Sequence, residues 1–92
     1  MVTRSAELVF LVSDARSLKD KRQVSRSLID KARRVFNASI AEVGTQDLHQ
    51  TLTIGVAVVS GKSSHAQEML DAVIRYLEEN TEAQLMGVEQ YE

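Results

Sequence analysis

The sequence predicts an α+β fold in which two helices cover one face of a four-stranded antiparallel sheet. Three observations lead to this prediction. The chain has 92 residues, of which 43% are hydrophobic, and this size and composition suit one globular domain spanning 1–92. Hydrophobic residues recur with a period of two in some segments and with the helical period in two others. These segments follow the order strand, helix, strand, strand, helix, strand, which is the ferredoxin-like βαββαβ plan.

The first strand is expected over 6–13, because hydrophobic positions alternate there. Its core-facing residues are Leu8, Phe10 and Val12. From Ser17 the spacing changes to that of a helix of about 19 residues. The hydrophobic positions of this helix are Leu18, Val24, Leu28, Ala32, Val35 and Phe36. Ser17 and Asp20 form a variant of the capping box, and Asn37 is expected to end the helix.

A second strand is expected over 38–43, and a third over 50–60 after a polar connection. The third strand has one hydrophobic face, formed by Leu52, Ile54, Val56 and Val58. A second helix is expected to begin at a capping box of Ser64 and Gln67 and to end at Asn80. Its hydrophobic positions are Ala66, Met69, Leu70, Val73, Ile74 and Leu77.

The last strand is expected over 82–91. Crossover connections in such folds are right-handed, so both helices should lie on the same face of the sheet. The first and third strands are the most hydrophobic and should therefore occupy the centre. The hairpin in the middle of the chain makes these two strands antiparallel. The two helices should then also run antiparallel.

The composition argues against several classes of protein. The chain has no cysteine, which excludes disulfides and thiolate chemistry and fits a reducing cytoplasm. The longest hydrophobic runs, 8–12 and 54–59, are far shorter than the ~20 residues that a membrane-spanning helix needs. No secretory signal precedes them. We therefore expect a cytoplasmic protein without membrane contact.

Three segments carry a resemblance to a known family: ARSLKDKR at 15–22, AEVGTQDLHQ at 41–50 and IGVAVVS at 54–60. Together with their spacing, they resemble the YlxP-like family of bacterial domains of unknown function (DUF503). The resemblance covers essentially the whole chain and implies a ferredoxin-like fold. Genes of this family often lie near translation-initiation and ribosome-maturation genes, which implies a role near RNA or ribosomes. Many relatives have an aromatic residue where His49 stands and a larger β-branched residue where Ala38 stands.

Charge is distributed unevenly along the chain. The net charge is −2, which argues against indiscriminate binding to nucleic acid. Segment 14–36 nevertheless has eight basic and three acidic residues and carries +5. Segment 63–92 has one basic and seven acidic residues and carries −6. The first predicted helix is therefore basic and the second is acidic.

The basic residues of the first helix form a stripe that is a candidate for phosphate contacts. At 100° per residue, one side of the helix presents Lys19, Arg22, Arg26 and Arg33. Arg16, just before the helix, extends this set. Such a stripe is typical of proteins that contact the backbone of RNA. We therefore expect RNA or the ribosome as a partner.

An alternative explanation for these charges is internal compensation. Lys19, Lys21 and Arg22 lie at the beginning of their helix, where the helix dipole disfavours cations. Glu78 and Glu79 are equally misplaced at the end of the second helix. If the helices are antiparallel neighbours, these two ends meet and the charges cancel. This explanation needs no ligand.

The uncovered face of the sheet is a second candidate interface. If Leu8 and Phe10 face the helices, then Val9 and Leu11 lie on the opposite face. Ala57 and Val59 of the third strand join them there. Exposed hydrophobic patches of this kind mark interfaces, and pairing of two sheets about a two-fold axis is the simplest one. We therefore expect a homodimer, or a scaffold module that recruits a partner, with His49 of the hairpin as a further contact.

No enzymatic activity, cofactor or metal is expected. Glu42, Asp47, His49 and Gln50 lie near one hairpin, but such a polar loop is typical of any hairpin end. The chain has two histidines, on distant elements. The loop after the first strand lacks glycine, so no anion or small-molecule site is expected there. Four aromatic residues are too few for base stacking on the sheet.

Overall fold

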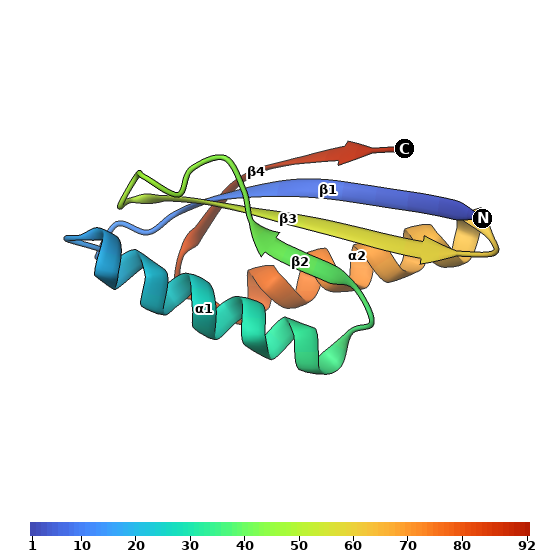
Figure 1. Ribbon diagram of the computed structural model, residues 1–92, viewed down its shortest axis with the longest axis horizontal. Coiled ribbons are helices and arrows are strands. Elements are labelled where there is room, and N and C mark those ends of the chain that lie inside the picture. Colours follow the sequence, from blue (N-terminus) through green and yellow to red (C-terminus); the bar gives the residue numbers. More distant parts are fainter.

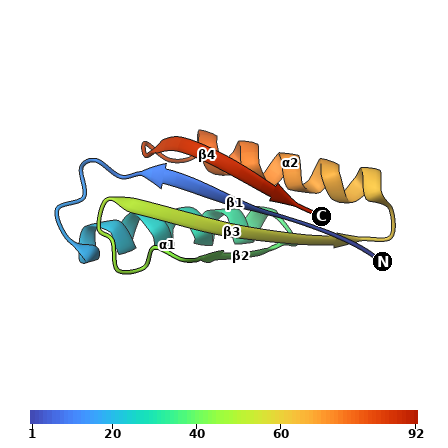
Figure 2. The same ribbon diagram turned by 90° about the horizontal axis from the view of Figure 1, so that it is seen from above.

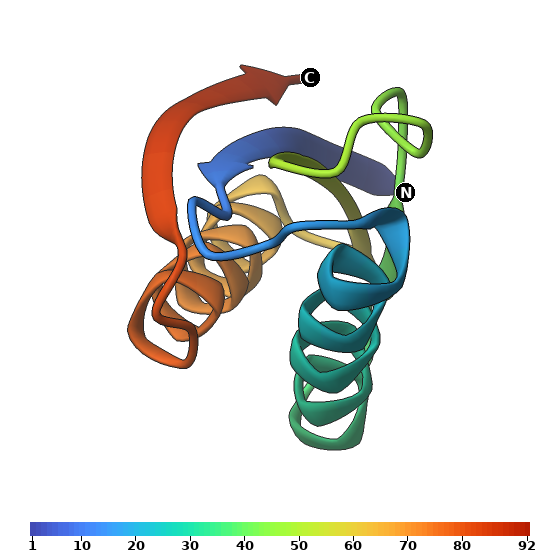
Figure 3. The ribbon, with the colours of Figure 1, turned by 90° about the vertical axis from the view of Figure 1, so that its left-hand side faces the viewer.

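The computed structural model describes residues 1–92 and confirms the ferredoxin-like architecture. Its elements are β1 (Val2–Leu11), α1 (Leu18–Val35), β2 (Ser39–Glu42), β3 (Thr51–Ser60), α2 (Ser63–Glu79) and β4 (Gln84–Tyr91). The strands form one antiparallel sheet in the order β2-β3-β1-β4, with the two most hydrophobic strands in the centre as predicted. Both helices lie on one face of this sheet and run antiparallel (Figures 1 and 3).

The core lies between the central strands and the helices. β1 and β3 pair over ten residues each, from Val2 opposite Ser60 to Leu11 opposite Thr51. Because side chains alternate along a strand, this register directs one set of residues from both strands to the helices. The fully buried members of that set are Leu8, Phe10, Leu52 and Ile54. From α2, the buried side chains that meet them are Ala66, Leu70, Val73 and Leu77.

The two helices begin differently. Ser17 caps α1 as predicted, and its Oγ accepts a hydrogen bond from the backbone N–H of Asp20 at 3.1 Å. The capping box predicted at Ser64 is wrong, because Lys62 occupies the N-cap position of α2 without a side-chain cap. Ser60 Oγ instead accepts from the backbone N–H of Lys62 and contacts His65 Nδ1. The chain thus turns into the helix before it reaches Ser64.

α1 packs on a face that only partly matches the predicted one: Leu28 and Ala32 are buried, and Val24 and Phe36 pack against the core, as expected. Val35, expected in the core, is 58% exposed. The buried residues of the helix are Lys21, Ser25, Leu28, Ile29 and Ala32. Burial of Ile29 turns the buried face of the helix away from Val35. The buried face then includes two polar residues near the beginning of α1, Lys21 and Ser25. One consequence is that Lys21 enters the protein interior.

The open face of the sheet is concave. β4 curves upward along one edge, and the connection between β2 and β3 rises above the sheet at the other (Figures 1 and 3). The register of β4 with β1 shifts between Val9 and Phe10, so that Met86 has no partner in β1. Such a bulge bends and twists a strand. Gly44, with φ of 77°, supplies the left-handed turn with which the β2–β3 connection begins.

β1 starts earlier than predicted, because Val2 to Ser5 pair with the end of β3. Figure 2 shows how far these central strands extend past the short β2. No helix of this chain combines the length and the hydrophobicity that crossing a bilayer requires.

Candidate functional site

Several basic residues at and before the beginning of α1 form an exposed surface that contains no ion pair. Lys19, Arg22 and Arg26 lie on one side of the helix, and Arg16 precedes it; all four are exposed. We call these four residues the basic flank. The ion pair that the structure contains joins Lys21 to Glu42, and none involves the basic flank. Four cations are therefore free to bind an external anion.

Arg33, the fifth residue of the predicted set, has a different environment. Its Nε donates to the carbonyl oxygen of Ile40 at 3.1 Å, and its Nη2 donates to the same oxygen. Ile40 belongs to β2, the strand at the edge of the sheet. The side of α1 that carries Arg33 and the basic flank therefore faces the β2 edge, away from α2. Arg33 is tied to the fold, while the other four bases are not.

The expected cancellation of charge between the two helices does not occur. The helices are staggered, so α2 ends beside the middle of α1 and not beside its first turn (Figure 1). Phe36, just past the end of α1, packs edge-on against Tyr76 in the last turn of α2, with ring centroids 5.4 Å apart. The beginning of α1 therefore extends beyond the end of α2. Neither Glu78 nor Glu79 forms an ion pair with a base of α1.

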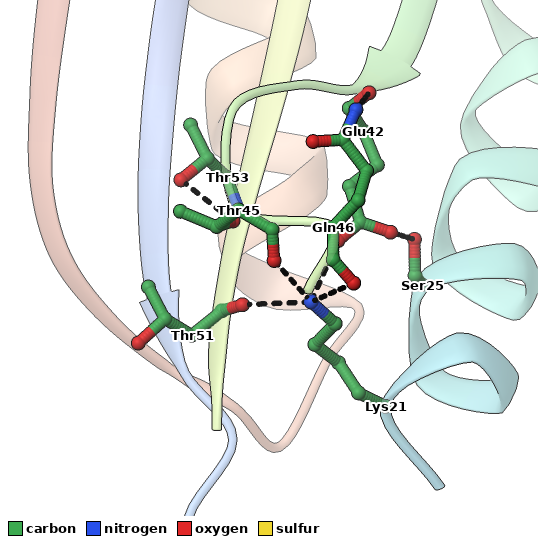
Figure 4. A network of polar contacts seen from close by, with 7 residues as sticks. All are labelled: Lys21, Ser25, Glu42, Thr45, Gln46, Thr51 and Thr53. Carbon is green, nitrogen blue, oxygen red and sulfur yellow. Dashed lines mark hydrogen bonds and ion pairs between the residues drawn. The ribbon is translucent and has the colours of Figure 1, made fainter. Parts of the chain in front are cut away.

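Lys21 is the residue of the basic segment that sequence reasoning placed wrongly. Its side chain is fully buried, and its Nζ lies 2.9 Å from Glu42 Oε2 (Figure 4). The same nitrogen donates to the carbonyl oxygens of Thr45 and Thr51, at 2.5 and 3.1 Å, and lies 3.4 Å from that of Gln46. The ammonium group therefore holds the β2–β3 connection against the first turn of α1.

Two further contacts complete this network. Ser25 Oγ donates to Glu42 Oε1 at 3.3 Å, which orients the carboxylate toward Lys21. Thr45 Oγ1 accepts from the backbone N–H of Thr53 at 2.9 Å. One signal in the sequence pointed to this arrangement. Lys21, Ser25, Leu28 and Ala32 recur at spacings of four, three and four, which is the spacing of a buried helix face.

The β2–β3 connection presents an exposed polar tip. His49 is exposed there, and Leu48 is 53% exposed. Gln50 ties the end of the connection to the β1–α1 loop, because its Nε2 donates to the carbonyl oxygens of Ser13 and Ala15, both at 3.3 Å. The structure thus places His49 close to the beginning of α1 and far from His65, which lies at the start of α2.

The predicted residues of the open sheet face do not form one uniform patch. Val9 and Leu11 are half-buried, whereas Ala57 and Val59 are exposed. Between the two edges lies a hollow of about 250 Å³. Its floor consists of the small residues Ser5, Ser39, Ala41, Gly55 and Ala57.

Two details shape this hollow. A Cβ at Gly55 would lie only 3.2 Å from Val43 Cγ1, so a larger residue there would displace the Val43 side chain that lines the hollow. Tyr91 lines the opposite side. Desolvation, followed by the nearby charges of Glu7 and Glu89, raises the pKa of the Tyr91 hydroxyl above its usual value. A tyrosine hydroxyl is both a donor and an acceptor of hydrogen bonds.

These features define a small α+β domain with the ferredoxin fold and an exposed basic helix. A designed protein with the ferredoxin fold, solved by NMR, has a similar backbone, with a TM-score of 0.59 and 18% identity. The match covers 99% of this chain and 84% of the designed one. The chain belongs to the family described as "Protein of unknown function (DUF503)", whose model matches residues 4–90. It is also 34% identical over 73 residues to the uncharacterized protein YlxP of Bacillus subtilis, covering 79% of each chain.

Proposed function

We propose that this protein is a non-enzymatic accessory factor that binds the phosphate backbone of RNA through the basic flank. The observation that carries the proposal is the set of four exposed, unpaired cations Arg16, Lys19, Arg22 and Arg26 in a chain with net charge −2. Exposed Lys and Arg side chains contribute to RNA affinity by releasing the counterions condensed on phosphates. The gene neighbourhoods that the family resemblance implies support RNA as the polyanion.

The shape of the surface favours contact with the backbone over recognition of bases. Arg22 and Arg26 are one helical turn apart, which is about 6 Å along the axis. This distance is similar to the spacing of successive phosphates in an extended strand. No aromatic residue lies in α1 itself, so the flank has no platform for base stacking. The proposed binding is therefore electrostatic and weakly dependent on sequence.

We expect the replacement of Arg22 and Arg26 by alanine to weaken RNA binding about tenfold at low salt. The logarithmic slope of affinity against salt concentration should fall by about 1.4, because each phosphate contact contributes ~0.7 for a single strand. Fluorescence anisotropy with a labelled single-stranded RNA of mixed sequence, titrated over a range of salt concentrations, measures both quantities. Both side chains are exposed, so the fold should not change.

The matched control replaces Lys62 and Arg75 by alanine. These two bases are also exposed, and they lie outside the basic flank. This variant loses the same net charge and should keep the wild-type slope. The proposal fails if wild-type protein has no measurable affinity at low salt, or if both double variants behave alike.

A second candidate function is self-association through the open sheet face, and we propose it because of one observation. The hollow of about 250 Å³ lies on the same face as Val59, which is 53% exposed, and Tyr91, which is 40% exposed. A face that carries both a hollow and protruding apolar side chains can be complementary to itself about a two-fold axis. The function would then be that of a dimeric scaffold.

Val59→Arg should convert a dimer of this kind to a monomer, because each of the two copies then places one positive charge in the interface. Light scattering during size-exclusion chromatography measures the mass. Val35→Arg is the control, since Val35 is 58% exposed on α1 and lies outside the sheet. A monomeric wild-type protein, or a Val59→Arg variant that is still dimeric, would exclude this interface.

A further inference from the structure

A cleft of about 510 Å³ separates α1 from the end of α2, on the side of α1 opposite to the basic flank. Its lining comes from the β1–α1 connection, the middle of α1 and the α2–β4 connection. The volume lies in the range of small-molecule sites, roughly 300–1,000 Å³. Eight of the twelve lining residues are polar or charged, so the cleft is not an unfinished part of the core.

The floor of the cleft is hydrophobic. It is formed by Val12, Val24, Leu28 and Ala83. Val12 and Leu28 are 5% and 2% exposed, so the floor belongs to the well-packed interior and is already in place without a ligand. A short branched hydrocarbon group would bury its surface against these side chains.

Part of the cleft lining is negatively charged. α2 ends here, and its last turn contains no basic residue. The carbonyl oxygens of Leu77, Glu78 and Glu79 accept no hydrogen bond from another residue, and a helix end of this kind carries about half a negative charge. The carboxylates of Asp14 and Glu82 line the same region. Lys31 is the one basic residue of the lining, and it forms no ion pair with either carboxylate.

Lys31 belongs to the part of the lining that α1 contributes. The hydroxyl and amide groups of the lining come from Ser13, Gln23, Ser27, Asn80 and Thr81. We propose that this cleft binds a small organic amine with a short hydrophobic group. The protonated amine lies between Asp14, Glu82 and the end of α2, and the hydrophobic group lies on the floor. A carboxylate on the same ligand reaches Lys31 but is secondary.

Three probes of similar size separate these contributions. Leucinamide has the amine and no carboxylate, leucine has both groups, and 4-methylpentanoate has the carboxylate alone. At about pH 6.5 the α-amines are protonated. Titrations followed by ¹H–¹⁵N correlation spectra should give saturable shifts at Ser27, Asn80 and Thr81 for both amines, with dissociation constants of order ~1 mM. Binding of 4-methylpentanoate should be at least about tenfold weaker.

Two variants test the location and the charge. Glu82→Gln removes one carboxylate from the exposed lining and should lower the affinity for leucinamide at least about threefold. Glu68→Gln makes the same change on an exposed part of α2 outside the cleft and should have no effect. Ser27→Phe fills the cleft from an exposed helical position and should abolish the shifts. Ser64→Phe is its control, because Ser64 is exposed in the first turn of α2.

The proposal is overturned if leucinamide produces no saturable shift at Ser27, Asn80 and Thr81, or if 4-methylpentanoate binds as tightly as leucinamide. It is also overturned if the Glu82→Gln and Glu68→Gln variants bind leucinamide with equal affinity. It is independent of RNA binding. Replacing Arg22 and Arg26 should leave the leucinamide titration unchanged, since neither residue lines the cleft.

Discussion

Lys21→Met should lower the free energy of unfolding by about 3 kcal/mol, because removing one partner of a buried ion pair leaves the other charge buried without a counter-ion. Glu42, whose side chain is only 15% exposed, would lose its counter-ion. The carbonyl oxygens of Thr45 and Thr51 would lose a donor at the same time. Methionine has a similar length and volume, so no cavity forms and the loss is electrostatic. Urea denaturation followed by circular dichroism measures the change.

Lys19→Met is the matched control, since it makes the same chemical change two residues earlier on an exposed position. It should alter the free energy of unfolding by less than about 0.5 kcal/mol. The double variant Lys21→Met with Glu42→Leu should recover part of the loss, because no charge is then left buried alone. A loss of unfolding free energy below about 1 kcal/mol for Lys21→Met would show that the buried contacts of Lys21 are not formed in solution.

Leu28→Ala should be comparably destabilising, by about 3 kcal/mol. Leu28 is 2% exposed, and α1 buries only two other apolar side chains, those of Ile29 and Ala32. The attachment of the helix to the sheet therefore depends strongly on this leucine. Truncation removes hydrophobic contact and leaves a space that the neighbouring strands cannot fill. The midpoint of urea denaturation should move to lower concentration with little change in slope.

Val35→Ala provides the comparison for Leu28→Ala. The hydrophobic spacing of the sequence assigns both residues to the core, but Val35 is 58% exposed. Its replacement should change the free energy of unfolding by less than about 0.5 kcal/mol. Equal costs for the two variants would mean that α1 packs on the face that its hydrophobic spacing alone indicates.

The fold could be read from the sequence because its signals are local and repeated. Alternation along β1 and β3, and the helical spacing of α2, each involve several residues whose burial agrees with the pattern. The cap at Ser17 is equally local, since the donor lies three residues away. The cap expected at Ser64 failed because Oγ of Ser60, the last residue of β3, accepts from the backbone N–H of Lys62 before the helix begins.

The candidate sites depend on contacts between distant segments, which local patterns do not encode. Lys21 and Arg33 are both basic residues of α1, and the sequence alone gives them similar roles. Their partners come from 24 residues further along the chain, at Thr45, and from β2 at Ile40. Those carbonyl groups remove two bases from the set available to an external anion. The stagger of the helices likewise leaves the end of α2 beside the cleft.

The sequence by itself determined the order of the elements, the central position of β1 and β3, and the side of the sheet that the helices cover. These follow from periodicity and from the handedness of chain connections, which act over short stretches. Only the tertiary structure decided which charges are buried, which are bound to the backbone and which are free. The reason is that a charge is stabilised by whatever oxygen or cation lies within a few ångströms, and here those groups come from other elements.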